Sequence, residues 1–153
     1  RPLTPRETNV LPSLVWELLA FTHYTPQGIE GGIIMSKQVS ETLQEMLGIL
    51  KQGQMTEGQK IYFADSVVTR EGNQPPVVGK QASIERLDKF RETIGVAAFV
   101  SYAIGAVAIS GNTSFYDSVL TVKLKNGETI NLEQVVKTDW QDGKIVKERY
   151  YHS

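Results

Sequence analysis

After Gly95 the sequence keeps the pattern of β-strands to its end, and this feature limits the chain to a small set of folds. Apolar and β-branched residues fill runs at about 96–109, 114–125, 128–140 and 144–152. The turn dipeptides between these runs are Gly111-Asn112, Asn126-Gly127 and Asp142-Gly143. Turns this short join antiparallel neighbours. We therefore predict an antiparallel meander.

A helical pattern lies ahead of this meander. Apolar residues recur at offsets 0, 4, 7, 8 and 11 before Gly53, and they are Val39, Leu43, Met46, Leu47 and Leu50. This spacing matches the 3.6-residue period of a helix and places the five side chains on one face. We predict that this face packs on the sheet.

Two more helices and one strand are predicted between this helix and the meander. Thr56 and Gln59 have the spacing of a capping box, and Asp65 is expected to cap or end the helix that they begin. Another helix is expected at 80–93. Residues 67–69 are β-branched and indicate a strand. The order of elements predicts an α+β fold with three helices on one face of a curved, mostly antiparallel sheet.

The first 34 residues differ in composition from the rest, since prolines at positions 2, 5, 12 and 26 interrupt any long element. A short helix is predicted at 12–21, with Leu14, Leu18 and Phe21 on one face. Because a regular pattern starts after Met35, we expect residues 1–34 to be an N-terminal extension, fused or non-native, and 35–153 to be the domain. The alternative is a genuine N-terminal helix with a glycine linker.

Composition excludes several classes of function. The chain carries 16 Lys and Arg against 17 Asp and Glu, so it lacks the basic surface that nucleic acid requires. It has no cysteine, and its two histidines, His23 and His152, lack the spacing of metal ligands. No phosphate loop or dinucleotide fingerprint is present, so no cofactor and no metal are expected. We also expect no membrane partner, and the cytoplasm is the default compartment.

The register of the last hairpin decides which residues face the helices. A three-residue loop, 141–143, would pair Trp140 with Lys144 and Val136 with Glu148. One face then carries Gln134, Val136, Thr138, Trp140, Val146, Glu148, Tyr150 and His152. We place this face toward the helices because it has fewer positive charges. A two-residue loop would slip the register by one and turn one strand over.

Two segments resemble a known family. They are YFADSVVTRE at 62–71, followed by PVVGK at 76–80, and WQDGKIVKERYY at 140–151. With the order of the elements, they resemble the SnoaL-like branch of the nuclear-transport-factor-2-like (NTF2-like) superfamily, which includes ketosteroid isomerases and limonene-epoxide hydrolases. The resemblance implies a cone-shaped, cystatin-like α+β roll with a blind apolar pocket. It also implies a homodimer paired through the sheet.

The same resemblance implies candidate catalytic residues and excludes one reaction. It places Glu71 where ketosteroid isomerases hold the aspartate that moves the proton. Those enzymes also use a helix tyrosine and a sheet aspartic acid to hold an oxyanion. The corresponding positions here are the stretch 45–48, which has no tyrosine, and Val135 or Val136. These departures argue against steroid isomerisation.

Other residues on the predicted inner face extend the candidate site. Tyr150 and His152 alternate on one strand, so we predict that with Glu71 they form a catalytic cluster for proton transfer. Substrate contacts are predicted at Thr69, Val136, Thr138, Trp140 and Glu148. Each residue also has a structural alternative. Glu148 and His152 would be hydrated at an open rim, Glu71 would pair with Arg70 or Lys80, and Tyr150 would be core. Either Tyr116 or Asp117 faces inward.

These observations leave three functions open. The first is an acid–base catalyst of the isomerase or cyclase type, acting without a cofactor on a small hydrophobic carbonyl compound. The second is a ligand-binding protein with no reaction. The third is a dimeric interaction domain whose cone is filled by side chains, for which the candidates are Phe63, Phe90, Phe99, Tyr102 and Trp140.

Overall fold

A computed structural model describes residues 26–152. The described residues from Met35 on form one compact unit, and the chain ahead of Met35 is not part of it. The helix predicted at 12–21 lies outside the described residues. That residues 1–34 are a fused or non-native extension stays a prediction.

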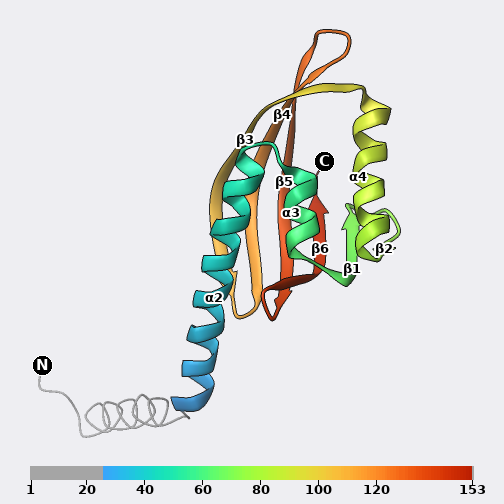
Figure 1. Ribbon diagram of the computed structural model, residues 1–153. Coiled ribbons are helices and arrows are strands. Elements are labelled where there is room, and N and C mark those ends of the chain that lie inside the picture. The colour runs from blue at the N-terminus through green and yellow to red at the C-terminus, as the bar shows by residue number, and fades with distance from the viewer. Residues whose placement is uncertain (1–25, 153) are drawn as a thin grey trace, which may run out of the picture. The chain divides into compact units, whose positions relative to one another are not determined.

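Three helices and a six-stranded sheet make up the fold of the described residues (Figure 1). The helices are α2 (Pro26–Lys51), α3 (Met55–Tyr62) and α4 (Lys80–Ile94). The strands are β1 (Phe63–Glu71), β2 (Val77–Val78), β3 (Val96–Ser110), β4 (Thr113–Leu124), β5 (Thr129–Gln141) and β6 (Lys144–Tyr151). The strand order is β2-β1-β6-β5-β4-β3, and only the β1–β6 pair is parallel. The predicted α+β fold and meander are confirmed.

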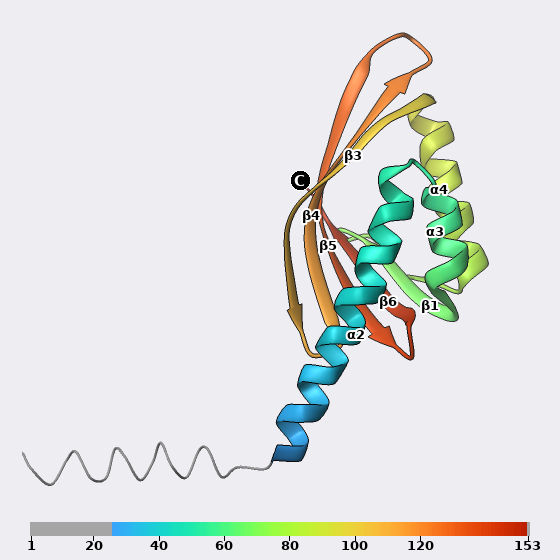
Figure 2. The ribbon, with the colours of Figure 1, turned by 60° about the vertical axis from the view of Figure 1, so that its left-hand side comes forward.

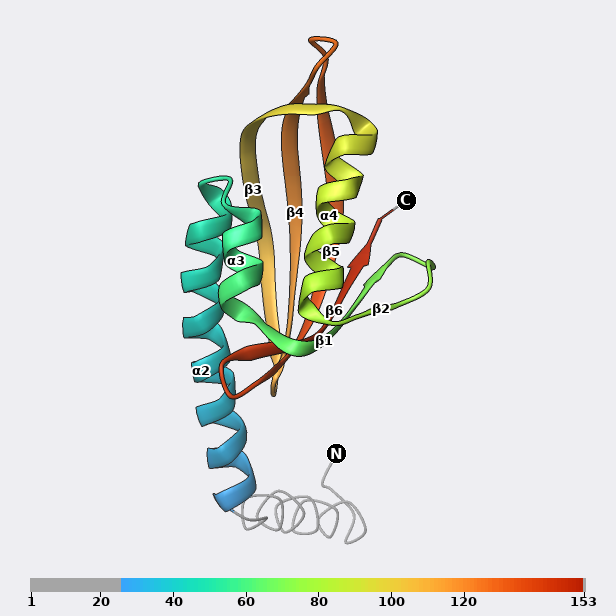
Figure 3. The ribbon, with the colours of Figure 1, turned by 45° about the vertical axis from the view of Figure 1, so that its right-hand side comes forward.

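From Met35 on, the helices α2, α3 and α4 lie on one face of the curved sheet (Figure 2 and Figure 3). The five apolar residues predicted on the helix before Gly53 lie on α2 and are all buried, none more than 7% exposed. They pack in one cluster with Phe63 of β1, Val136 and Trp140 of β5 and Ile145 of β6. Burial of each such side chain stabilises the fold by roughly 1.5–3 kcal/mol. The core therefore sits between the helices and the inner face of β1, β6, β5 and β4.

The start and the end of α3 differ from the prediction. The helix begins at Met55, and its N-cap is Gln54 with no side-chain cap, so the Thr56–Gln59 capping box is wrong. The helix ends at Tyr62 because Phe63 is already extended and pairs with Ile145 of β6. Asp65 therefore lies within β1 as an exposed residue and caps no helix.

The last hairpin has a two-residue turn followed by a β-bulge. Gln141 is opposite Lys144, and Trp140 is opposite Ile145, but Asp139 is opposite Lys147. The predicted pairing of Trp140 with Lys144 and of Val136 with Glu148 is therefore wrong. Turn and bulge each shift the register by one residue, so beyond the bulge the two shifts restore the predicted faces. Near the turn they do not, and Ile145 rather than Val146 is fully buried.

Another bulge bends β3 at Gly105 and Ala106, where the register with β4 shifts. The outward-pointing carboxylate of Asp117 accepts a hydrogen bond from the backbone N–H of Ala106. It occupies the space that a side chain on Gly105 would need. Glycine at 105 thus lets an aspartate on β4 hold the bulge.

We expect Gly105→Ala to lower the free energy of unfolding by about 1–2 kcal/mol, because the new Cβ displaces the Asp117 carboxylate from Ala106. Urea denaturation measures this change. Gly48→Ala is the matched control, since its Cβ would meet nothing within 4 Å on helix α2. That control should raise the free energy by about 0.5–1 kcal/mol. Changes of equal sign and size in both variants would contradict this role of Asp117.

Candidate functional site

Three neighbouring strands place most of the predicted site residues on the inner face of the sheet. Thr69 of β1 is opposite Glu148 of β6, which is opposite Thr138 of β5. In the next inward row, Glu71 is opposite Tyr150, which is opposite Val136. Directly opposed residues of a sheet share a face. The parallel pairing of β1 with β6 therefore brings together residues that are about 80 positions apart in the sequence.

Glu148 is the buried acid of this group. Glu148 is only 6% exposed to solvent. Thr138 donates a hydrogen bond to Oε1 at 2.9 Å, and the Tyr150 hydroxyl donates to Oε2 at 2.5 Å. Burial raises the pKa of Glu148 from 4.5 to about 7, although both hydrogen bonds oppose the rise. The alternative of a hydrated Glu148 at an open rim is wrong.

A pair of buried tyrosines lies on the neighbouring strands. The Tyr102 hydroxyl of β3 donates to the Tyr116 hydroxyl of β4 at 3.5 Å. Burial raises the pKa of both phenols, and the charge of Glu148 raises both further. The sequence predicts Tyr102 only as a side chain that fills the cone, and it does not decide which face of the sheet carries Tyr116. Tyr116 is opposite Val136, and this pairing turns it inward and Asp117 outward.

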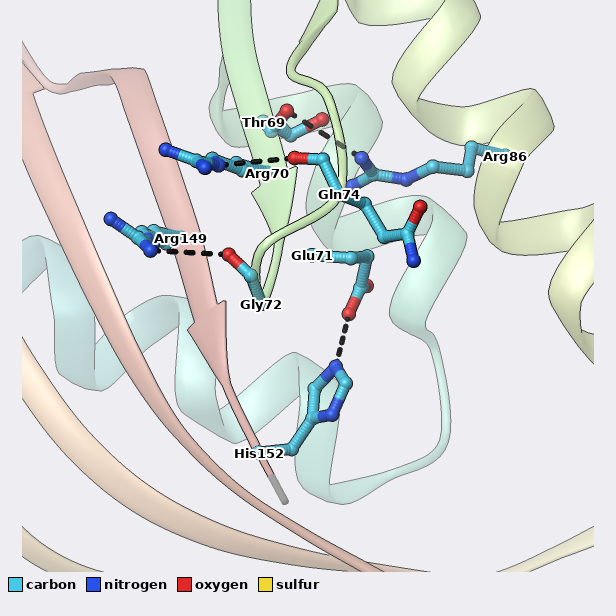
Figure 4. A network of polar contacts seen from close by, with 8 residues as sticks. All are labelled: Thr69, Arg70, Glu71, Gly72, Gln74, Arg86, Arg149 and His152. Atoms are coloured by element: carbon cyan, nitrogen blue, oxygen red, sulfur yellow. Dashed lines mark hydrogen bonds and ion pairs between the residues drawn. The ribbon is translucent and has the colours of Figure 1, made fainter.

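Glu71 and His152 form a second polar pair where the inner face meets solvent. His152 Nε2 lies 3.0 Å from Glu71 Oε2, and the two side chains are 42% and 35% exposed (Figure 4). Glu71 therefore pairs with His152 rather than with Arg70 or Lys80. The charge of Glu71 also raises the pKa of Glu148 and of Tyr150. The Glu71–His152 pair therefore lies within electrostatic range of Glu148 and Tyr150.

Thr69 and Trp140 are held by contacts to other elements. The Thr69 hydroxyl lies 2.8 Å from the Ser83 hydroxyl and joins β1 to α4. The Trp140 indole N–H donates to Ser114 at 2.9 Å, and its ring meets Tyr62 edge-on. The structure shows both residues in supporting contacts, and their predicted contact with substrate stays a prediction.

A surface depression of about 260 Å³ lies beside Trp140. Its lining comes from α2, from the β3–β4 turn, and from the end of β5 with the turn that follows it. The residues are Gln38, Val39, Thr42, Asn112, Trp140, Gln141, Asp142 and Gly143. Trp140 is two residues from Thr138 on the same inward face of β5. A pocket at Glu148 itself, as the resemblance implied, stays a prediction.

Two further findings concern metal ions and membranes. Among residues 26–152, no group of three or more histidine, aspartate or glutamate side chains is arranged to hold a metal ion. Over the same residues, no helix is long and apolar enough to span a membrane.

No family model and no curated protein matches the sequence, whereas solved structures do match. A proposed SnoaL-like polyketide cyclase of Mesorhizobium loti is 21% identical, with a TM-score of 0.63 over 74% of this chain and 98% of that one. An NTF2-like protein of Burkholderia pseudomallei is 15% identical, with a TM-score of 0.64 over 76% and 91%. An LEH-like epoxide hydrolase of M. tuberculosis is 14% identical, with a TM-score of 0.60 over 77% and 84%. These likenesses show that the chain shares its fold with these SnoaL-like and NTF2-like structures.

Proposed function

We propose that the protein is an acid–base catalyst that moves a proton on a small hydrophobic carbonyl compound, with the carboxyl group of Glu148 as the proton carrier. The observation that carries this proposal is the environment of Glu148. It is buried, it accepts hydrogen bonds from Thr138 and Tyr150, and its pKa is raised to about 7. A general base works best when its pKa lies near the working pH.

The proposed step needs no cofactor. The Glu148 carboxylate takes a proton from the carbon next to the carbonyl group, and the electron pair of the broken C–H bond moves onto the carbonyl oxygen. The protonated carboxyl then returns its proton to a carbon of the enolate, which restores a carbonyl compound and the original base. The two transfers balance, and the net reaction is an isomerisation when the proton returns to a different carbon from the one that lost it.

The developing enolate oxygen needs a hydrogen-bond donor, and we assign this role to the buried hydroxyl of Tyr116. Its hydroxyl oxygen accepts the hydrogen bond from Tyr102, so its own hydrogen is left to donate. Donors fixed in a buried site stabilise such charge far more than they do in water. Glu71 and His152, the predicted catalytic residues at the solvent boundary, would carry protons between this site and water.

The test is hydrogen exchange at carbon. The protein is incubated in D₂O at pH 7.5 with a panel of apolar cyclic ketones and lactones, and proton NMR follows the loss of the α-hydrogen signals. We expect at least one compound to exchange faster than in buffer that contains an equal concentration of a protein of another fold. No acceleration for any compound, with the protein folded, would contradict the proposal.

One observation favours the third of the functions left open by the sequence, an interaction domain whose cone is filled by side chains. Phe63, Tyr102 and Trp140 are buried in the core, as that alternative requires. Phe90 and Phe99 do not fit it, because they are 44% and 36% exposed. The same panel separates the candidates. A ligand-binding protein would bind a ketone without exchange, whereas an interaction domain would neither bind nor exchange.

We further propose a homodimer through the outer face of β3 and β4. That face carries apolar side chains, among them Ala103 and its cross-strand neighbour Val119. Sedimentation velocity at micromolar concentration should give twice the 17.0 kDa chain mass. Ala103→Arg should give a folded monomer, because a cation would be buried in the interface. The matched control is Ala82→Arg on the exposed side of α4, which should remain dimeric. A monomeric wild type would contradict the proposal.

A further inference from the structure

A row of three cationic side chains crosses the outer face of the sheet, opposite to the face that carries Glu148. Arg70 of β1 is directly opposite Arg149 of β6, and Arg149 is directly opposite Lys137 of β5. Their sequence neighbours Thr69, Glu148 and Thr138 are buried, so the three cations point outward. Directly opposed residues have Cβ atoms about 4.5–5.5 Å apart, and like charges at that spacing are destabilising.

Among the residues whose side chains are described, 36–152, no acidic side chain forms an ion pair with Arg70, Arg149 or Lys137. The acid next along β5 on the same face, Asp139, accepts a hydrogen bond from Thr113 and is opposite Lys147 rather than a member of the row. The row therefore concentrates positive charge on a chain whose net charge is -1.

The two guanidinium groups are held in place by neutral partners. Arg70 Nε donates to the carbonyl of Gln74 at 3.0 Å, and Arg149 donates to the carbonyl of Gly72 at 3.2 Å (Figure 4). Arg149 also stacks on the ring of Tyr151 at 4.6 Å, and its Nε is buried with no hydrogen-bond partner. In Figure 4 both groups point to the same side, away from Glu71 and His152. Each keeps further N–H donors for a ligand.

We propose that this row binds a phosphate dianion, as carried by a phosphate monoester with an apolar organic part. Two arginines offer the forked donors that match the oxygens of phosphate, and the lysine adds a third positive charge. The apolar part follows from the next outward row, where Tyr151 is opposite Val135 and the two residues are 41% and 42% exposed. The site lies on the face opposite to Glu148 and does not depend on the proposed catalysis.

Phenyl phosphate and inorganic phosphate are the probes, titrated at constant ionic strength into ¹⁵N-labelled protein. We expect saturable shifts of the amide signals of residues 70, 137 and 149, with phenyl phosphate bound several-fold more tightly. Equal affinities for the two probes would support the phosphate site and indicate that its ligand is free phosphate rather than a monoester. Shifts that do not saturate by about 20 mM, or that lie elsewhere on the protein, would overturn the proposal.

Lys137→Glu separates a ligand site from a merely charged surface. It should raise the melting temperature without ligand by roughly 1–3 °C, since an acid then faces Arg149. It should also weaken phenyl phosphate binding at least tenfold. Lys89→Glu, an exposed residue of α4, is the matched control and should keep the affinity within about twofold. Arg70→Gln should weaken binding as well. Equal losses in Lys137→Glu and Lys89→Glu would show only long-range attraction and overturn the site.

Discussion

Glu148→Gln is expected to slow enzyme-catalysed exchange of α-hydrogens by roughly 10²–10⁴-fold, the contribution that a positioned general base makes. Glutamine has almost the shape of glutamate, and its carbonyl oxygen can still accept one of the two hydrogen bonds that Thr138 and Tyr150 donate to the carboxylate. The other hydroxyl must turn to accept from the amide N–H. Glutamine cannot take up a proton near neutral pH. The measurement is the rate of exchange in D₂O for a compound that the wild type accepts, at saturating concentration.

Glu71→Gln is the matched control, because it makes the same chemical change at the solvent boundary. Glu71 is 35% exposed and pairs with His152, so we expect its loss to slow exchange less than about tenfold. The opposite order, with Glu71→Gln as the more damaging change, would make Glu71 the base and leave Glu148 a supporting residue. That outcome would restore the role that the family resemblance implied for Glu71.

Tyr150→Phe adds an independent readout of the same site. The Tyr150 hydroxyl donates to Glu148 and thereby lowers the pKa of that carboxyl. Its removal should raise the pKa of Glu148, so the acid limb of the pH–rate profile should move to higher pH. A tyrosine that merely fills space would change the rate without moving this limb.

The elements of the fold could be predicted from the sequence because their signals are local. The 3.6-residue stripe of α2 and the turn dipeptides of the meander depend on neighbours within a few positions. The prediction of a capping box at Thr56 was wrong because it also rested on a local signal alone. A short motif cannot show that the chain reverses at Gly53, where φ is 81°, and that the helix already begins at Met55.

The inner face was predicted for the wrong reason. The sequence favoured a three-residue hairpin loop, whereas the structure has a two-residue turn and a bulge. Two single-residue shifts restore the alternation, so Glu148 and Tyr150 point inward as predicted. Bulges carry no clear sequence signal at this position, since Ile145 and Val146 are both β-branched and either could be buried.

The special character of Glu148 could not have been predicted from local sequence. The segment from Lys147 to Arg149 has a charged residue at each position and is typical of an exposed strand. Glu148 becomes buried because β1, which is remote in sequence, pairs with β6 in parallel and places Thr69 beside it. A long-range pairing of this kind leaves no trace in the spacing of residues. The raised pKa follows first from that burial and then from the charge of Glu71, another residue of β1.

The same burial makes the stability of the wild type depend on pH. The carboxyl of Glu148 has a pKa of about 7 in the folded protein, against 4.5 for an ordinary glutamate. Between these values the folded state holds a proton that the unfolded state has released, so the free energy of unfolding falls as pH rises. The loss is complete above about pH 7 and amounts to roughly 3 kcal/mol, at about 1.36 kcal/mol for each pKa unit.

Glu148→Gln should remove this loss, so urea denaturation at pH 8 should find the variant more stable than the wild type by up to roughly 3 kcal/mol. Near pH 4.5 the two proteins should have similar stability, because the wild-type carboxyl is then protonated in the fold. If the free energies of unfolding of the wild type and the variant differ by a constant amount from pH 4.5 to 8, Glu148 does not titrate in this range. A variant that is more stable and inactive would show that the protein keeps a costly buried carboxylate for its reaction. A variant that is more stable and still active would separate that cost from catalysis and remove Glu148 from the mechanism.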